Sequence, residues 1–296
     1  MNIESLIIIF TYLPYYDLLN IALSNKYFNN IINDDYFWKQ YVIKNNLLNI
    51  ITKFKKIYFT YKNSFKMYII CKNLNKYNLS KNYTDIIYLT DFNIYSFQKV
   101  YYIPKYIKEL KLIESIDIYN NNLINIDNIF ELNLKKIMLS YNQITTIPIQ
   151  IKNFKNLRFL TINNNQIKKI PNEFCLLENL SILNLSHNKI KYLPSSFKKL
   201  NKLEILYISF NLLSKFPKSF KYLNNLIKLD ISYNRITKIP NISSLSNLSN
   251  LDLRNSKIIK INKHINDLHN LRYLILNINM KPFNILNNTN IIYYIN

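Results

Sequence analysis

Apolar residues recur at fixed intervals over the second half of the chain, in the pattern LxxLxLxxNxIxxIP. Successive copies begin at residues 134, 157, 180, 203, 226, 248 and 271, so the step is 23 residues with a single step of 22. The LxxLxL stretch alternates as a short strand with one buried face does. The constant period therefore predicts a solenoid in which each copy adds one strand to a parallel sheet.

The alignment of the copies also predicts the faces of each strand. In the copy that begins at residue 157, Leu160 and Ile162 point inward, whereas Phe159 and Thr161 point outward. A shortened copy fits residues 113–133. We therefore expect eight strands, from about Ser115 to about Leu276.

Two polar or turn-forming positions complete the pattern. An asparagine closes the strand region at Asn121, Asn142, Asn165, Asn188, Asn211 and Asn234. Its amide both donates and accepts, so it can satisfy backbone groups where the chain turns away from the sheet. Ser256 takes this place in the sixth full copy, where we expect a weaker contact. The proline that ends the pattern in five copies predicts extended backbone on the opposite face, at Pro148, Pro171, Pro194, Pro217 and Pro240.

These positions together resemble the leucine-rich repeat. The resemblance implies an α/β repeat solenoid, a leucine-rich-repeat horseshoe with a parallel concave sheet, whose asparagines form a ladder through the core. It also favours protein binding over catalysis. Residues 100–282 are assigned to this array, and residues 283–296, which lack the pattern, to a C-terminal cap over its open edge.

Residues 1–42 follow helical spacing instead. Apolar residues recur three and four positions apart, and Pro14 and Asp17 interrupt them as a helix end and a new start would. A further short segment begins after Asp34 and Asp35 and contains Trp38, the single tryptophan of the chain.

This segment resembles an F-box, a small all-helical domain. The matching residues are Leu6, Ile9, Tyr12, Leu13, Pro14, Asp17, Leu18, Leu19, Leu23, Lys26, Phe28, Ile31, Ile32, Asp34, Phe37, Trp38 and Lys39. The family opens with Leu-Pro-x-Glu, of which this chain keeps only Glu4. The alternative is a helical cap on the repeats whose aromatic residues are core.

The F-box resemblance implies binding to a Skp-type adaptor of a cullin–RING ubiquitin ligase. The apolar side chains expected to contact the adaptor are Leu6, Ile9, Leu13, Pro14, Leu18 and Leu19. Residues 43–99 are expected to form a helical linker or N-terminal cap between this domain and the repeats.

The outward strand positions contain an apolar island next to charged residues. The candidate substrate-binding residues are Met138, Phe159, Ile182, Ile205, Tyr207, Asp230, Asp252 and Arg254. Exposed apolar clusters with a charged rim are typical of partner sites. The alternative is that an isoleucine-rich chain carries apolar residues on this face without a partner.

The formal net charge of +22 would ordinarily indicate nucleic acid or an anionic membrane as a partner. The chain has no glycine, one alanine, and four arginines against 35 lysines, a bias that follows AT-rich codons. Such a bias is compatible with a large DNA virus of protists or an AT-rich eukaryote. Because base readout favours arginine, we do not expect nucleic-acid binding.

Several site classes find no support in the sequence. Two cysteines and three separated histidines form no metal or nucleophile pattern, and a phosphate loop needs glycine. No disulfide framework, signal peptide or membrane span is expected, so the expected location is the cytoplasm. For a viral protein, this would be the cytoplasm or nucleus of the host cell. Without glycine, backbone positions with positive φ are expected to hold mainly asparagine.

The sequence therefore predicts a substrate-recognition subunit of a Skp–cullin–F-box ubiquitin ligase, without enzymatic activity or cofactor and monomeric outside its complex. Two alternatives stay open. One is a leucine-rich-repeat scaffold without a ubiquitin role, and the other is a basic nucleic-acid-binding protein.

Overall fold

The computed structural model describes residues 35–45, 47, 90–94, 100–259, 261–277 and 290–294. The chain divides into two compact units, Met1–Tyr88 and Leu89–Asn296. The six residues expected to contact an adaptor lie outside the described residues, as do most of residues 43–99, for which a helical linker or cap was expected.

In the first unit, helix α4 (Asp35–Lys44) begins where the sequence indicated a new segment. Phe37, Trp38, Tyr41 and Val42 are buried, and the Phe37 and Trp38 rings meet edge to face at 5.1 Å. Burial also raises the pKa of the Tyr41 phenol. The apolar side of α4 is therefore packed rather than exposed to solvent.

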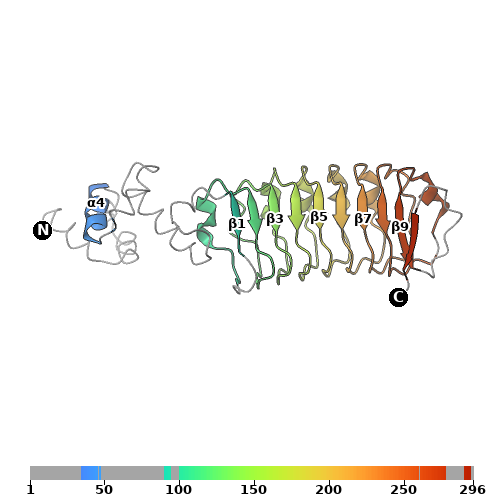
Figure 1. Cartoon of the computed structure of the whole chain (residues 1–296), viewed down its shortest axis with the longest axis horizontal. Coiled ribbons are helices and arrows are strands. Elements are labelled where there is room, and N and C mark those ends of the chain that lie inside the picture. Colours follow the sequence, from blue (N-terminus) through green and yellow to red (C-terminus); the bar gives the residue numbers. More distant parts are fainter. Residues whose placement is uncertain are drawn as a thin grey trace. The chain divides into compact units, whose positions relative to one another are not determined.

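The second unit contains one parallel sheet of ten short strands, which pair in chain order (Figure 1). The strands are β1 (Asp91–Asn93), β2 (Ser115–Asp117), β3 (Lys136–Met138), β4 (Phe159–Thr161), β5 (Ile182–Asn184), β6 (Ile205–Tyr207), β7 (Lys228–Asp230), β8 (Asn250–Asp252), β9 (Tyr273–Asn277) and β10 (Asn290–Tyr294). Inward leucine and isoleucine side chains from successive strands form a continuous buried core. The predicted solenoid is confirmed.

The eight expected strands are present as β2 to β9, and the described residues contain two further strands that were not expected. Strand β1 precedes the array predicted to begin at residue 100, and β10 lies in the segment predicted to be a cap. Phe92 and Ile94 supply the inward residues at β1, and β10 pairs with β9 over five residues. A terminal strand packs against one neighbour only, so fewer positions are constrained and the repeat pattern fades there.

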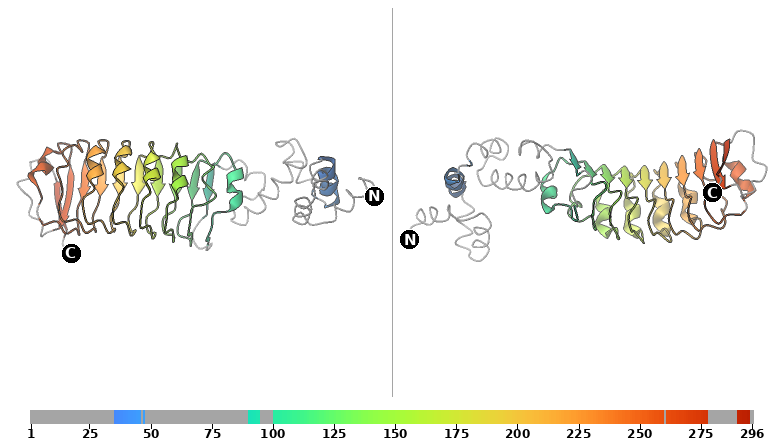
Figure 2. Two further views of the ribbon diagram at one scale, coloured as in Figure 1. Left: turned by 180° about the vertical axis from the view of Figure 1, so that it is seen from behind. Right: turned by 60° about the horizontal axis from the view of Figure 1, so that its bottom comes forward.

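The face opposite the sheet carries short 3₁₀ helices (Figure 2). They are η2 (Lys105–Glu109), η3 (Ile149–Asn153), η4 (Asn172–Leu176), η5 (Ser195–Lys199), η6 (Lys218–Tyr222) and η7 (Lys263–Asp267). The prolines before η3 to η6 are extended, as expected, but a helical turn follows each of them. Proline suits that junction because its φ is fixed and the start of a helix needs no N–H from it.

The asparagine ladder is confirmed. Asn188 donates from Nδ2 to the carbonyl oxygens of Ile162 (3.0 Å), Leu185 (3.0 Å) and Ser186 (3.3 Å). Its Oδ1 accepts from the backbone N–H of Ile167 at 2.9 Å. Ile162 and Ile167 belong to the preceding repeat, so each buried amide joins two repeats. Equivalent contacts recur at Asn121, Asn142, Asn165, Asn211 and Asn234.

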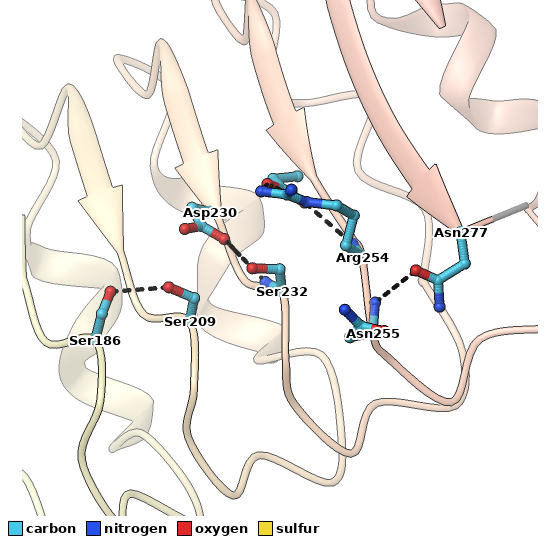
Figure 3. Close-up of polar contacts among 8 residues, drawn as sticks. Ser186, Ser209, Asp230, Ser232, Arg254, Asn255 and Asn277 are labelled. Atoms are coloured by element: carbon cyan, nitrogen blue, oxygen red, sulfur yellow. Dashed lines mark hydrogen bonds and ion pairs between the residues drawn. The ribbon is translucent and has the colours of Figure 1, made fainter. Parts of the chain in front are cut away.

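Ser256 makes the reduced contact that the sequence predicted. Its hydroxyl donates to the carbonyl oxygen of Leu253, within its own repeat, at 2.9 Å. A separate bond joins this copy to the next one, since the Oδ1 atom of Asn277 accepts from the backbone N–H of Asn255 at 2.8 Å (Figure 3).

We predict that Asn188→Ala lowers the free energy of unfolding by about 2–4 kcal/mol, because it leaves buried backbone groups in two repeats without partners. Ser256→Ala removes one hydrogen bond and should cost about 1 kcal/mol or less. Denaturant unfolding followed by circular dichroism measures both. Equal losses in the two variants would contradict the ladder's role.

Candidate protein-binding surface

The strand register aligns the outward residues of successive strands in two columns. One column contains Asp117, Met138, Thr161, Asn184, Tyr207, Asp230, Asp252 and Ile275. The other contains Ser115, Lys136, Phe159, Ile182, Ile205, Lys228, Asn250 and Tyr273. We call this surface the sheet face.

Five apolar residues of the sheet face form one island on neighbouring strands. Met138, Phe159, Ile182, Ile205 and Tyr207 come from the consecutive strands β3 to β6, and each is partly exposed. The structure therefore brings together the five apolar residues that the sequence singled out. Whether they bind a partner stays a prediction.

Two lysines, which the sequence analysis did not include, cover the aromatic rings of the island. The Lys136 ammonium lies 5.5 Å from the centre of the Phe159 ring, and that of Lys228 lies 5.1 Å from the centre of the Tyr207 ring. Such cation–π contacts are worth about 0.5–1 kcal/mol at exposed sites. Both lysines stand at outward positions of the repeat alignment, so that alignment was the signal that could have found them.

The three charged candidates are engaged with groups close to them in the chain. Arg254 donates to both carboxylate oxygens of Asp252, with Nη2 at 2.6 Å from Oδ2, and this hydrogen bonding raises the pKa of the guanidinium (Figure 3). Asp230 accepts from the backbone N–H and the hydroxyl of Ser232 at 3.1 and 2.6 Å. These hydrogen bonds lie at the ends of the strands, and the charges of Asp252 and Arg254 neutralise each other.

The positions that follow the strands are mostly closed to a partner. Ser140, Ser186, Ser209 and Ser232 are buried, and the Ser186 and Ser209 hydroxyls are hydrogen-bonded at 3.0 Å (Figure 3). The serine positions therefore bind neighbouring repeats to each other.

Next to the serines, the residue before each ladder position has a left-handed backbone. These residues are Asn120, Tyr141, Asn164, His187, Phe210, Tyr233 and Asn255, with φ from 46° to 58°. Asn128, in a separate turn, has φ 71°. The expectation that asparagine would fill such positions holds for four residues and is wrong for the four aromatic ones.

Ring stacking between repeats offsets the unfavourable backbone of the aromatic residues. The Phe210 ring lies between those of His187 and Tyr233, with centroid distances of 4.0 and 3.9 Å and interplanar angles of 12° and 11°. Tyr119 and Tyr141 meet edge to face at 5.2 Å. We call these five residues the aromatic edge. For four of the five, the signal in the sequence was an aromatic residue directly before the ladder asparagine, whereas Tyr119 lies two positions before Asn121.

The aromatic edge adds exposed apolar area beside the sheet face. Tyr119, Tyr141 and Phe210 are 42%, 47% and 40% exposed. Because interfaces are enriched in aromatic side chains, the edge and the island together form the candidate protein-binding surface.

Other chemistry finds little support in the described part of the chain. No group of three His, Cys, Asp or Glu side chains there could hold a metal ion. Cys175 is buried, and burial raises the pKa of its thiol, which disfavours the nucleophilic thiolate. Burial also raises the pKa of Asp117, whose Oδ1 is buried without a hydrogen-bond partner. Among the described helices, none has the length and apolar character that crossing a bilayer requires.

We predict that Phe210→Leu lowers the free energy of unfolding by about 1–2 kcal/mol, since it removes the stacking but keeps a side chain that disfavours positive φ. Phe210→Asn should cost less, because asparagine tolerates the left-handed region. Denaturant unfolding of both variants checks this order, and a larger loss in Phe210→Asn would contradict the account.

Comparison with known proteins agrees with both parts of this organisation. Leucine-rich-repeat family models match residues 155–213, 132–174 and 225–245, and an F-box-like model matches residues 3–44. Among curated proteins, none matches the chain.

Solved structures show a similar repeat architecture. Internalin C2 of Listeria monocytogenes is 20% identical, with a TM-score of 0.62 over 70% of this chain and 92% of that one. A leucine-rich-repeat protein of Leptospira interrogans is 24% identical, with a TM-score of 0.47 over 69% of this chain and 64% of that one. At these identities the likeness concerns the fold alone. The chain combines an F-box-like region at residues 3–44 with leucine-rich repeats across residues 132–245.

Proposed function

We propose that this chain is the substrate-recognition subunit of a Skp–cullin–F-box ubiquitin ligase. The observation that carries the proposal is the presence, in one chain, of an F-box-like region and a leucine-rich-repeat array. Both parts are protein-interaction modules. In this role the chain supplies no chemistry and no cofactor, and it works in the cytoplasm or nucleus.

The division of the chain supports two separate binding tasks. The F-box-like region lies wholly within the first compact unit, which ends at Tyr88. Leu6, Ile9, Leu13, Pro14, Leu18 and Leu19 are assigned to an apolar contact with the Skp-type adaptor, by resemblance to the F-box. The buried aromatic residues of α4 give this region a packed element of its own.

The second unit is suited to holding a protein substrate. Strands β2 to β9 are fixed by neighbours on both sides, so the sheet face is a stiff platform with an apolar island at β3 to β6. A stiff receptor raises the effective concentration of a bound substrate near a ubiquitin-conjugating enzyme more than a flexible tether would.

We predict that the full chain captures a Skp-type adaptor and that Leu13→Asp with Pro14→Ala abolishes the capture, because a buried carboxylate in an apolar contact costs at least about 2 kcal/mol. Co-purification with and without residues 1–42 measures this. Capture that survives both changes, or no capture by the intact chain, would favour the plain scaffold.

We predict that Phe159→Asp and Tyr207→Ala each weaken substrate capture by tenfold or more, about 1.4 kcal/mol, as the loss of a central aromatic anchor does. Ile149→Asp is the matched control, because Ile149 is 53% exposed on the opposite face. Affinity capture with quantitative mass spectrometry compares the three variants. Unchanged capture by Phe159→Asp and Tyr207→Ala would exclude the island.

A further inference from the structure

A basic hollow lies on the face opposite the sheet, between η5 and η6. It has a volume of about 560 Å³, and its lining includes Lys191, Lys198, Lys215, Lys218 and Lys221 together with Tyr222. Five lysines thus surround one hollow, and no aspartate, glutamate or arginine is among its described lining residues. We call it the lysine hollow.

The charge of the lysine hollow does not follow from the repeat geometry. A hollow of similar volume, about 530 Å³, is lined in the following repeats by Thr237, Ile239, Ile259, Ile261 and Asn262, with two lysines, Lys238 and Lys263, among its described residues. The same inter-repeat groove can therefore be made with far less positive charge.

Two ammonium groups of the lysine hollow are held beside one ring. The Nζ atoms of Lys198 and Lys221 lie 5.6 and 4.9 Å from the centre of the Tyr222 ring. Like charges gathered in this way repel, and the ring offsets only part of that cost. A carboxylate placed among them would gain from several ammonium groups at once.

The lysine hollow also offers apolar surface. Tyr192 and Tyr222 are 57% and 46% exposed, and most of the exposed lining consists of carbon atoms, including lysine stems. An occupant that fits this surface carries both negative charges and apolar side chains.

We propose that the lysine hollow binds an acidic segment of a partner protein, in which carboxylates alternate with apolar side chains. Single-stranded nucleic acid is the less suitable occupant, since it stacks bases on free aromatic faces and often uses arginine. The Tyr222 ring carries two ammonium groups, and the described lining has no arginine. The proposal does not depend on the ligase role, because neither the F-box-like region nor the sheet face contributes to the hollow.

The test measures fluorescence anisotropy of a labelled peptide of alternating glutamate pairs and leucines with the intact chain. Poly-glutamate and oligo-thymidylate of equal charge are the comparison ligands. We expect the mixed peptide to bind most tightly, and to lose about tenfold in affinity between ~50 and ~300 mM salt.

One triple variant removes three of the five lysine charges of the hollow: Lys198→Gln, Lys215→Gln and Lys221→Gln. The matched control is Lys152→Gln, Lys155→Gln and Lys257→Gln, which changes the net charge equally at exposed sites outside the hollow. The hollow variant should lose at least about tenfold in affinity and the control less than about twofold. Equal losses, no binding by the intact chain, or tighter binding of oligo-thymidylate would each overturn the proposal.

Discussion

The repeat array depends on one interaction, the buried amide that joins backbone groups of neighbouring repeats. Strands of three residues supply few ladder hydrogen bonds, and the chain must then turn sharply away from the sheet. At that turn several carbonyl and N–H groups are buried, and a buried group without a partner costs about 1–3 kcal/mol. One asparagine satisfies three carbonyls and one N–H there, so the same residue closes the turn and fixes the spacing of the repeats.

The turn that the amide closes also requires a left-handed residue directly before it. A chain with glycine could fill this position at little cost, but this chain has none. His187, Phe210 and Tyr233 are held there by stacking on one another across repeats, and the backbone N–H of Phe210 donates to the carbonyl of Ser232 in the next repeat at 3.1 Å. A constraint of the backbone has thereby produced the exposed aromatic edge.

The sequence predicted the parts of the structure that every repeat must share. We could predict the strand register, the inward residues and the ladder, because one residue type has the same role in each copy. The 3₁₀ helices were missed because a proline followed by polar residues is equally compatible with extended chain. Strands β1 and β10 were missed because end positions are less constrained, and the pairing of Asp252 with Arg254 depends on side-chain conformations that no pattern specifies.

The two faces of the array also differ in the charges that surround their candidate binding surfaces. On the sheet face, Lys136 and Lys228 lie over aromatic rings, and the neighbouring column supplies negative charge from Asp117, Asp230 and Asp252. On the opposite face, lysines gather around one hollow without a described acidic residue in its lining. Composition bias can raise the number of lysines in the whole chain, but it acts on every repeat alike. It therefore does not account for the difference between five lysines around one hollow and two among the described residues of another.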